Sequence, residues 1–255
     1  MAVSGQDFAG KTALVIGGTA GIGRAASIAF GKAGANVVVS GLGWSEGREV
    51  ESEIRAAGGE ALFVEADVTR EEDIRDLMKH AAEKFGRVHM AVNNAGTEGK
   101  FGPVHERTSE DFDQIIGINL KGIFLGMKYQ IPHMLEHGGG AIVNTSSSAG
   151  VTGIPNVAIY TASKHGVVGL TKATALELAQ SNIRVNAVAP GPVNTGLLAR
   201  MIEGKIPVSV IAESVPMHRV SEPDEIAGAI VWLCSDAASY VTGHTLVVDG
   251  GLTIE

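Results

Sequence analysis

The chain has 255 residues, of which 45% are hydrophobic and 19% are charged, and its net charge is −8. This composition predicts a folded protein with a large core and excludes a disordered tail. The negative charge and the lack of a Lys/Arg block argue against nucleic acid or an anionic membrane as the main partner. The single cysteine, Cys234, excludes a disulfide within the chain, and its apolar neighbours predict a buried thiol.

Targeting signals are not visible in the sequence. Met1–Phe8 lacks the pattern of a signal peptide, and no apolar run approaches the roughly 18 residues of a transmembrane helix. We therefore expect a cytoplasmic protein with no membrane partner. No linker or change of composition divides the sequence, so we expect a single domain over residues 1–255.

The first predicted unit is a strand, a glycine-rich loop and a helix. The strand, 12–16, is a continuous apolar run of the kind found in a sheet covered on both faces, and an apolar helical pattern follows over 24–33. A loop in this position aims backbone N–H groups and a helix N-terminus at a phosphate. Gly17 permits the tight turn, Gly21 a close approach to pyrophosphate, and Gly23 close packing of helix on strand.

The second predicted strand, 36–40, bears on the choice of cofactor. In dinucleotide-binding folds an acidic residue after this strand holds the ribose hydroxyls. Here Gly41 and Leu42 follow, and no acid stands nearby. The nearest basic residues are Arg24 and Arg48, so the sequence leans mildly towards NADP(H) over NAD(H).

The next elements are predicted as helices over 45–57 and 70–85 and strands over 61–64 and 88–92. Asp67 follows the third strand, where it either accepts a hydrogen bond from an adenine amino group or caps the next helix. Thr69 is an equal candidate for that cap. The sequence Asn-Asn-Ala-Gly at 93–96 follows the fourth strand, and its small residues and amides suit the lining of a cofactor site.

A long apolar helix is predicted after a loop over 97–107. Thr108 caps it, with Asp111 in the position of a capping box. Its apolar residues extend nearly all round, which predicts a buried helix, and Pro132 kinks or ends it. Asn119 lies within this stretch, so its amide is either a satisfied structural group or part of a site.

The helix predicted over 157–180 carries Tyr160 and Lys164, which share one face at this spacing. A nearby cation favours the phenolate and lowers the pKa of a tyrosine, which is one way to obtain a general acid/base. The competing interpretation is a surface helix with an amphipathic tyrosine. The strand 141–145 precedes this helix and opens into three serines over 146–148.

The last part is predicted as a strand over 183–189, a helix over 223–235 and a strand over 246–248. The stretch 196–219 between them is less regular, and a loop of this length in a compact protein is usually functional. We therefore expect a substrate lid over about 194–219.

The predicted order is a strand and a helix six times in succession, followed by a closing strand. It predicts an α/β fold, a Rossmann-type doubly wound parallel sheet of about seven strands with helices on both faces. Ligands of such sheets lie beyond the carboxyl ends of the strands. The glycine loop, 93–96, 146–148 and Pro190-Gly191 all follow strands directly, so they converge on that edge.

These motifs together resemble the short-chain dehydrogenase/reductase family over essentially the whole chain. The matching residues are Gly17, Gly21 and Gly23 of its cofactor loop, Asp67-Val68, Asn93-Asn94-Ala95-Gly96, the tetrad Asn119, Ser147, Tyr160 and Lys164, and the segment with Pro190-Gly191 and Thr195. Ser147 stands thirteen residues before Tyr160, the usual spacing in the family. The chain departs from the family at Ile16, where a threonine is common, and at Gly41-Leu42, which match neither cofactor signature.

The resemblance implies an NAD(P)-dependent oxidoreductase that interconverts a ketone or aldehyde and an alcohol. Tyr160 is its general acid/base, Ser147 binds the carbonyl oxygen, Lys164 lowers the tyrosine pKa and binds ribose, and Asn119 positions a water. The implied cofactor contacts are Gly17, Thr19, Gly21, Ile22, Gly23, Gly41, Leu42, Asp67, Val68, Asn94, Ala95, Gly96, Tyr160, Lys164, Pro190, Gly191, Val193 and Thr195. No metal is implied, and the resemblance implies a homotetramer with 240–255 near a subunit contact.

The expected pocket segments, 97–105, 148–159 and 194–219, are mainly apolar and carry few charges. They predict a neutral, apolar carbonyl or alcohol substrate. A 3-oxoacyl-carrier-protein-type reductase and a sugar dehydrogenase of the same family remain alternatives, and sugar epimerases and enoyl reductases are disfavoured. A non-catalytic dinucleotide-sensing scaffold is the alternative from another class, since fold alone does not fix function.

Overall fold

The computed structural model describes residues 8–202 and 206–254. In this part of the chain seven strands form one parallel sheet, in the order β3-β2-β1-β4-β5-β6-β7. The strands are β1 Thr12–Ile16, β2 Asn36–Gly41, β3 Ala61–Glu65, β4 Met90–Asn93, β5 Gly140–Thr145, β6 Ile183–Pro190 and β7 Thr245–Val248. Most of Met1–Phe8, three residues of the expected lid and the last residue of 240–255 lie outside the described residues.

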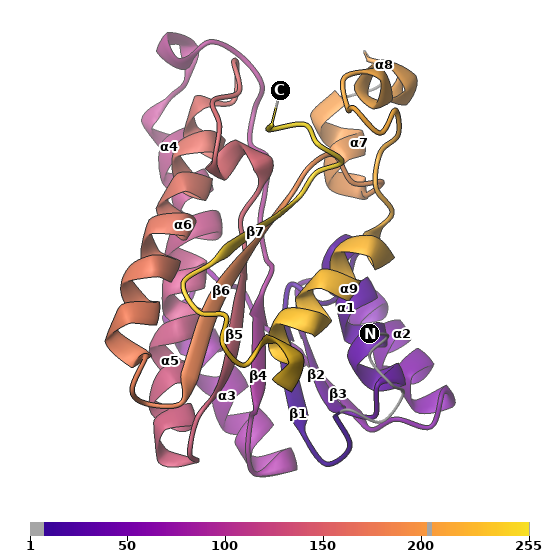
Figure 1. The fold of residues 1–255 in the computed structure, drawn as a ribbon, viewed down its shortest axis with the longest axis vertical. Coiled ribbons are helices and arrows are strands. Elements are labelled where there is room, and N and C mark those ends of the chain that lie inside the picture. Colours follow the sequence, from indigo (N-terminus) through magenta and orange to yellow (C-terminus); the bar gives the residue numbers. More distant parts are fainter. Residues whose placement is uncertain (1–7, 203–205, 255) are drawn as a thin grey trace.

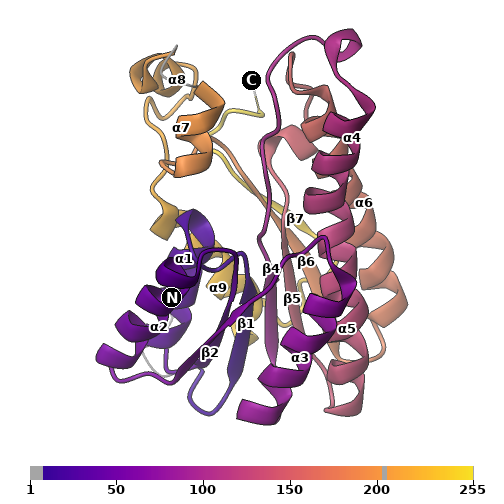
Figure 2. The same ribbon diagram turned by 180° about the vertical axis from the view of Figure 1, so that it is seen from behind.

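Helices cover both faces of this sheet (Figures 1 and 2). One face carries α1 Gly21–Lys32, α2 Trp44–Ala56 and α9 Pro223–Cys234, and the other carries α3 Glu71–Phe85, α5 Gly122–Glu136 and α6 Ala158–Leu178. Alternate residues of β1 feed the two cores, with Ala13 and Val15 in one and Leu14 and Ile16 in the other. The predicted Rossmann-type fold is confirmed. None of the helices in the described ranges has the length and apolarity needed to cross a bilayer.

The long apolar helix consists of α4 Ser109–Ile116, a π-helical turn Gly117–Lys121 and α5. The predicted capping box is present, with Thr108 and Asp111 bonded to each other's backbone N–H groups. The prediction of a buried helix is wrong at Phe112 and Phe124, which are 48% and 47% exposed. Pro132 does not end the helix, which continues to Glu136.

The stretch expected to be irregular holds two short helices, α7 Gly196–Ile202 and α8 Val208–Glu213, with Pro207 as the N-cap of α8. We call residues 193–202 and 206–222 the α7–α8 segment. It lies beyond the carboxyl ends of the strands (Figure 1). Its two ends pair with each other, because Val193 and Ser221 form a parallel bridge and the Asn194 N–H donates to the Ser221 carbonyl at 2.8 Å.

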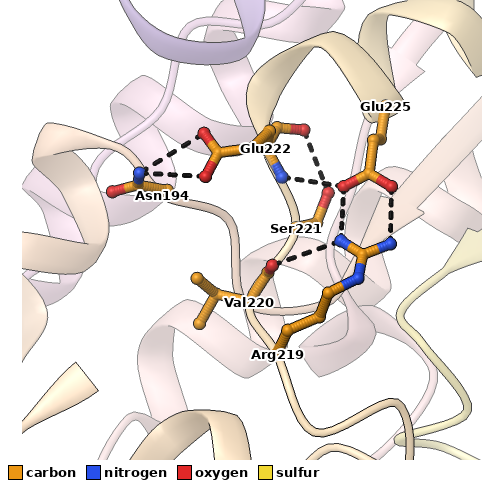
Figure 3. Close-up of polar contacts among 6 residues, drawn as sticks. All are labelled: Asn194, Arg219, Val220, Ser221, Glu222 and Glu225. Carbon is orange, nitrogen blue, oxygen red and sulfur yellow. Dashed lines mark hydrogen bonds and ion pairs between the residues drawn. The ribbon is translucent and has the colours of Figure 1, made fainter. Parts of the chain in front are cut away.

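Side chains fasten this base to the start of α9 (Figure 3). Arg219 meets Glu225 through two contacts of 2.7 Å, and this pairing is the main reason that the pKa of Glu225 falls to about 2. Glu222 and Glu225 form a capping box at the helix start, and Asn194 donates to the Glu222 carboxylate at 3.2 Å. The two ends of the α7–α8 segment are therefore held together and held against the start of α9.

Candidate active site

The glycine loop fits a pyrophosphate. A Cβ atom on Gly23 would lie 1.8 Å from the Gly17 carbonyl oxygen, and one on Gly17 would lie 2.5 Å from the Ala95 nitrogen. The N-cap of α1 is Ala20, which offers no side-chain oxygen, and the first turn from Gly21 holds no acidic residue. The first N–H groups of this helix are therefore free of a side-chain cap, and no carboxylate lies in the same turn, as suits an anion site.

The end of β2 carries no acid, as predicted. Leu42 is exposed there, and its carbonyl accepts a hydrogen bond from the Thr19 hydroxyl at 3.2 Å. Both nearby arginines already have acidic partners, since Arg24 is paired with Glu53 and Arg48 with Glu51. A 2′-phosphate would have to share these arginines with glutamates. The remaining predicted contacts, Ile22 and Gly41, lie at the first turn of α1 and the last residue of β2.

Asp67 caps its own turn and not the next helix. Its Oδ1 accepts from both the N–H and the hydroxyl of Thr69, at 2.9 and 2.8 Å. The N-cap of α3 is Arg70, so the predictions that Asp67 or Thr69 caps this helix are wrong. The adenine contact stays a prediction for Asp67, and for the buried Val68 beside it.

Hydrogen bonds join the glycine loop to Lys164. Asn94 donates to the Gly17 carbonyl at 3.0 Å and accepts from the Thr145 hydroxyl at 3.1 Å. The Thr145 carbonyl in turn accepts from Lys164 Nζ at 2.9 Å. The cofactor loop, the ends of β4 and β5, and α6 are thus fixed relative to one another. Sequence reasoning missed Thr145, because no motif marks it.

A second polar network lies beneath this edge and is buried. Asn93 donates to Asn144 at 2.9 Å, Gln130 donates to Asn93 at 2.8 Å, and Asn144 donates to Thr171 at 3.0 Å. Buried amides are costly unless they are bonded, and fully bonded networks give rigidity. This network ties β4 and β5 to α5 and α6.

Tyr160 and Lys164 lie on the same face of α6, as predicted. Both are buried, and Nζ lies 5.6 Å from the centre of the tyrosine ring. Burial lowers the pKa of Lys164 to about 8. The pKa of Tyr160 is raised, and burial is the largest cause. The hydrogen bond with the Ser147 side chain acts against this rise, and the negative charge of Glu98 adds to it. The expected lowering of the tyrosine pKa is therefore not seen, because burial dominates and the side chains that act on the phenol are Ser147 and Glu98, not Lys164.

The three serines after β5 have different surroundings. Ser146 is buried and donates to the Lys164 carbonyl at 3.0 Å, and Ser148 is buried at the start of a short 3-10 helix. Ser147 is half-buried, and its hydroxyl accepts a hydrogen bond from the Ala149 N–H at 3.2 Å. A hydrogen bond with its side chain acts to lower the pKa of Tyr160. Ser147 is thus the serine that a substrate can reach, in line with the spacing argument.

Asn119 is held by the π-helical turn and is buried. Its amide accepts from the Thr97 N–H at 2.7 Å and donates to the Thr97 carbonyl at 2.9 Å and the Ser163 hydroxyl at 3.1 Å. A Cβ atom on Gly96 would lie 3.4 Å from Asn119 Oδ1 and 3.5 Å from Lys164 Nζ. The structure therefore brings these two residues together at Gly96.

The segment after β6 reaches back to the cofactor loop. A Cβ atom on Gly21 would lie 3.1 Å from the Thr195 methyl group, and one on Gly191 would lie 2.8 Å from Asp249 Cα. Val193 is buried at the base of the α7–α8 segment. Pro190 ends β6, so the predicted nicotinamide segment starts at the same sheet edge as the other motifs.

An apolar wall connects α7 to the reaction centre. Met201 of α7 and Ile154 pack against the buried cluster of Ala149, Val157 and Tyr160. This contact gives the predicted apolar lining beside the tyrosine. In residues 8–202 and 206–254 no group of three or more His, Cys, Asp or Glu side chains is arranged to hold a metal ion.

Known proteins match this chain over nearly its full length. The profile of the family described as "Enoyl-(Acyl carrier protein) reductase" matches residues 17–253. A cyclohexanol dehydrogenase from Acinetobacter sp. is 41% identical and matches over 98% of both chains. A 2,5-dichloro-2,5-cyclohexadiene-1,4-diol dehydrogenase from Sphingobium indicum is 43% identical over 97% of this chain and 99% of its own. A cis-4-hydroxycyclohexanecarboxylate dehydrogenase from Sinomonas cyclohexanicum is 42% identical over 98% and 99%.

Solved structures agree with these relatives. Levodione reductase superimposes with a TM-score of 0.93 at 34% identity, over 97% of this chain and 99% of its own. A 3-ketoacyl-(acyl-carrier-protein) reductase from Brucella melitensis, complexed with NADH, gives 0.91 at 38% identity, over 96% and 99%. This chain binds a nicotinamide dinucleotide and interconverts alcohols and carbonyl compounds. It belongs to the short-chain dehydrogenase/reductase family.

Proposed function

We propose that this enzyme oxidises a neutral secondary alcohol on a six-membered ring, or reduces the matching ketone. The observation that carries this proposal is the apolar wall of Ile154, Val157 and Met201 directly beside Tyr160. Three relatives support the ring, because their names specify a cyclohexanol, a cyclohexadiene diol and a hydroxycyclohexane carboxylate. The six-membered carbon ring in these three names is compact and apolar, as such a wall requires.

The proposed chemistry uses four side chains. The nicotinamide group supplies or accepts the hydride. Tyr160 gives a proton to the ketone oxygen or removes one from the alcohol, and Ser147 hydrogen-bonds that oxygen. Lys164 binds the cofactor ribose, and Asn119 holds the Thr97 backbone and orders water next to Lys164. Because burial raises the pKa of Tyr160, its protonated form dominates at neutral pH, so oxidation should accelerate as pH rises while reduction stays level.

The proposal is tested with Tyr160→Phe and a substrate panel. Turnover should fall by roughly 10²–10⁴-fold, the usual contribution of a general acid/base, while cofactor affinity by fluorescence titration stays the same. The panel compares cyclohexanol and cyclohexanone with a sugar, a β-ketoacyl thioester and an enoyl thioester. Preference for a thioester would support a carrier-protein reductase instead. Cofactor binding without turnover of any compound would support the sensing scaffold.

We propose that the enzyme uses both cofactors, with a slight preference for NADP(H). The end of β2 offers no carboxylate to repel a 2′-phosphate, but Glu53 already pairs with Arg24 and Glu51 with Arg48. The measured ratio of kcat/KM for NADP(H) over NAD(H) should therefore be below about tenfold. Glu53→Gln removes the shorter of two carboxylate contacts of Arg24, the other being Glu49 at 3.7 Å, and should raise this ratio. A large preference for NAD(H) in the wild type would contradict the proposal.

We propose that the enzyme is a homotetramer. The exposed Phe124 belongs to a groove on α4, α5 and α6, and the exposed Phe112 lies on α4. The groove is lined by Ile116, Leu120, Lys121, Phe124, Gly166, Gly169, Leu170 and Ala173. An apolar face of this kind marks a contact surface. Tyr240 at the start of the C-terminal segment is fully exposed and suits the second contact. Light scattering should give four chains for the wild type and fewer for Phe124→Glu.

We also propose that the chain forms one domain and works in the cytoplasm. The two cores flank one continuous sheet, which predicts a single cooperative unfolding transition. The only cysteine, Cys234, is buried, and burial raises its pKa to about 12, so it suits a reducing compartment. Calorimetry and cell fractionation test the two statements, and two separate transitions would contradict the first.

A further inference from the structure

The site holds a buried carboxylate that the proposed chemistry does not use. Glu98 lies in the loop between β4 and α4, and its side chain is only 10% exposed. Arg200 of α7 binds it with both ends of the guanidinium, Nε to Oε1 at 2.7 Å and Nη2 to Oε2 at 3.2 Å. A buried carboxylate is costly even when it is paired, so such a residue in a pocket calls for a function.

This ion pair adjoins the reaction centre on both sides. Thr97, the neighbour of Glu98, is held by Asn119 through two hydrogen bonds. Met201, the neighbour of Arg200, packs with the cluster that contains Tyr160. The pair therefore links the loop after β4 to α7 across the place where the substrate has to bind.

The two charges of the pair are screened unequally. The Arg200 side chain is 63% exposed, so water weakens its field, whereas Glu98 is nearly enclosed. The negative charge of Glu98 reaches Tyr160 and raises its pKa. Lys164 of α6 is a second buried charged group near the phenol, and its Nζ is bonded to the Thr145 carbonyl. Of the two charges in the pair, Glu98 is therefore the one that acts on Tyr160.

We propose that Glu98 and Arg200 are the specificity-determining pair of the substrate pocket: Glu98 rejects substrates that carry a negative charge, and Arg200 holds Glu98 and α7 in place. This inference rests on the proposed function and assigns the substrate class of the same site. Glu98 touches no reacting atom, so it is a specificity and positioning residue and not a catalytic one.

The test uses the full chain with its cofactor and two substrates of the same shape, 4-hydroxycyclohexanecarboxylate and its methyl ester. The wild type should prefer the neutral ester. Glu98→Gln should lower the ratio of kcat/KM for ester over acid by at least about tenfold, because like charges in a pocket are strongly unfavourable. It should also shift the pH profile of ester oxidation to lower pH, since the tyrosine no longer faces that anion.

Arg200→Met is an independent variant that should change the ratio of kcat/KM for ester over acid in the opposite direction. It leaves Glu98 charged and unpaired, so the ratio of ester over acid should rise by a few-fold to about tenfold, and KM for the ester should rise as α7 loses its contact. Lys11→Gln is the control, because it breaks an ion pair outside the pocket segments, with Asp236 at 3.2 Å, and should change neither the ratio of ester over acid nor the pH profile.

The outcomes are distinct. An unchanged ratio and pH profile in Glu98→Gln would overturn the inference while the proposed function stands. If Glu98→Gln does not fold, a fall or no change of the ratio in Arg200→Met overturns it, and a rise supports it. A wild type that prefers the acid also overturns it. A wild type that oxidises no ring alcohol contradicts the proposed function itself.

Discussion

The sheet edge around α6 and the α7–α8 segment meet at one site but are held in different ways. At the sheet edge, Asn119, Asn144 and Lys164 are almost completely buried, and their hydrogen bonds go to backbone or to other buried groups. The α7–α8 segment is attached by a two-residue bridge, by the exposed pair of Arg219 with Glu225 and by the pair of Arg200 with Glu98. The difference teaches that the groups proposed for chemistry are fixed, whereas the wall that meets the substrate is fastened at few points.

The largest expected effect breaks the fixed region at the cofactor loop. Gly23→Ala would place a Cβ atom 1.8 Å from the Gly17 carbonyl, so the backbone that receives the pyrophosphate has to move. Cofactor affinity should fall by roughly a thousandfold in calorimetric titration. Gly228→Ala in α9 is the matched control, since a Cβ atom there meets nothing within 4 Å, and it should leave affinity unchanged and stabilise the fold slightly. Equal cofactor affinities in the two variants would contradict the assignment of the glycine loop as the pyrophosphate site.

The second effect concerns the cost of burying Lys164. Its folded pKa of about 8 lies below the ordinary 10.5. Between these values the unfolded chain binds a proton that the folded chain has released, so stability rises with pH. In urea unfolding without cofactor, the free energy of unfolding of the wild type relative to Lys164→Met should increase by about 3 kcal/mol from pH 8 to 10.5. The same comparison with Lys172→Met, at an exposed position of α6, should show no such trend. If the difference in unfolding free energy between the wild type and Lys164→Met did not change with pH, the burial of Lys164 would be contradicted.

The smallest effect loosens the α7–α8 segment. Arg219→Met removes the pair with Glu225, which is exposed and therefore weak. KM for the alcohol should rise a few-fold with little change in kcat or in melting temperature, and limited proteolysis of the segment should become faster. A fall in kcat as large as that expected for Tyr160→Phe would mean that the two regions are not independent.

Much of the fold follows from local patterns, and the exceptions have physical causes. Apolar runs identify the strands, because both faces of a parallel sheet are buried. The burial predicted for Phe112 and Phe124 failed, because the sequence pattern of an apolar helix face is the same whether that face packs on the core or is exposed at the surface. The π-helical turn at Asn119 has no sequence signal, and α7 and α8 are too short for periodicity to identify.

That Tyr160, Lys164 and Ser147 lie close together was predictable from residue type and spacing. The direction of the pKa shift of Tyr160 was not, because burial causes it, and burial is a property of the packed structure. Glu98 was not predictable either, since it and Arg200 are 102 residues apart and neither belongs to a spaced motif. Contacts of that separation become visible only when the chain is folded.

The packing of α9 on α1 has a consequence for synthesis of the protein. Phe30 of α1 and Ile226, Ile230 and Leu233 of α9 share one core, although they lie near opposite ends of the chain. During translation this face of the first strands and α1 stays uncovered until α9 has left the ribosome. Nascent chains that stop before Pro223 should therefore expose apolar surface, and this core is completed only once α9 has been made.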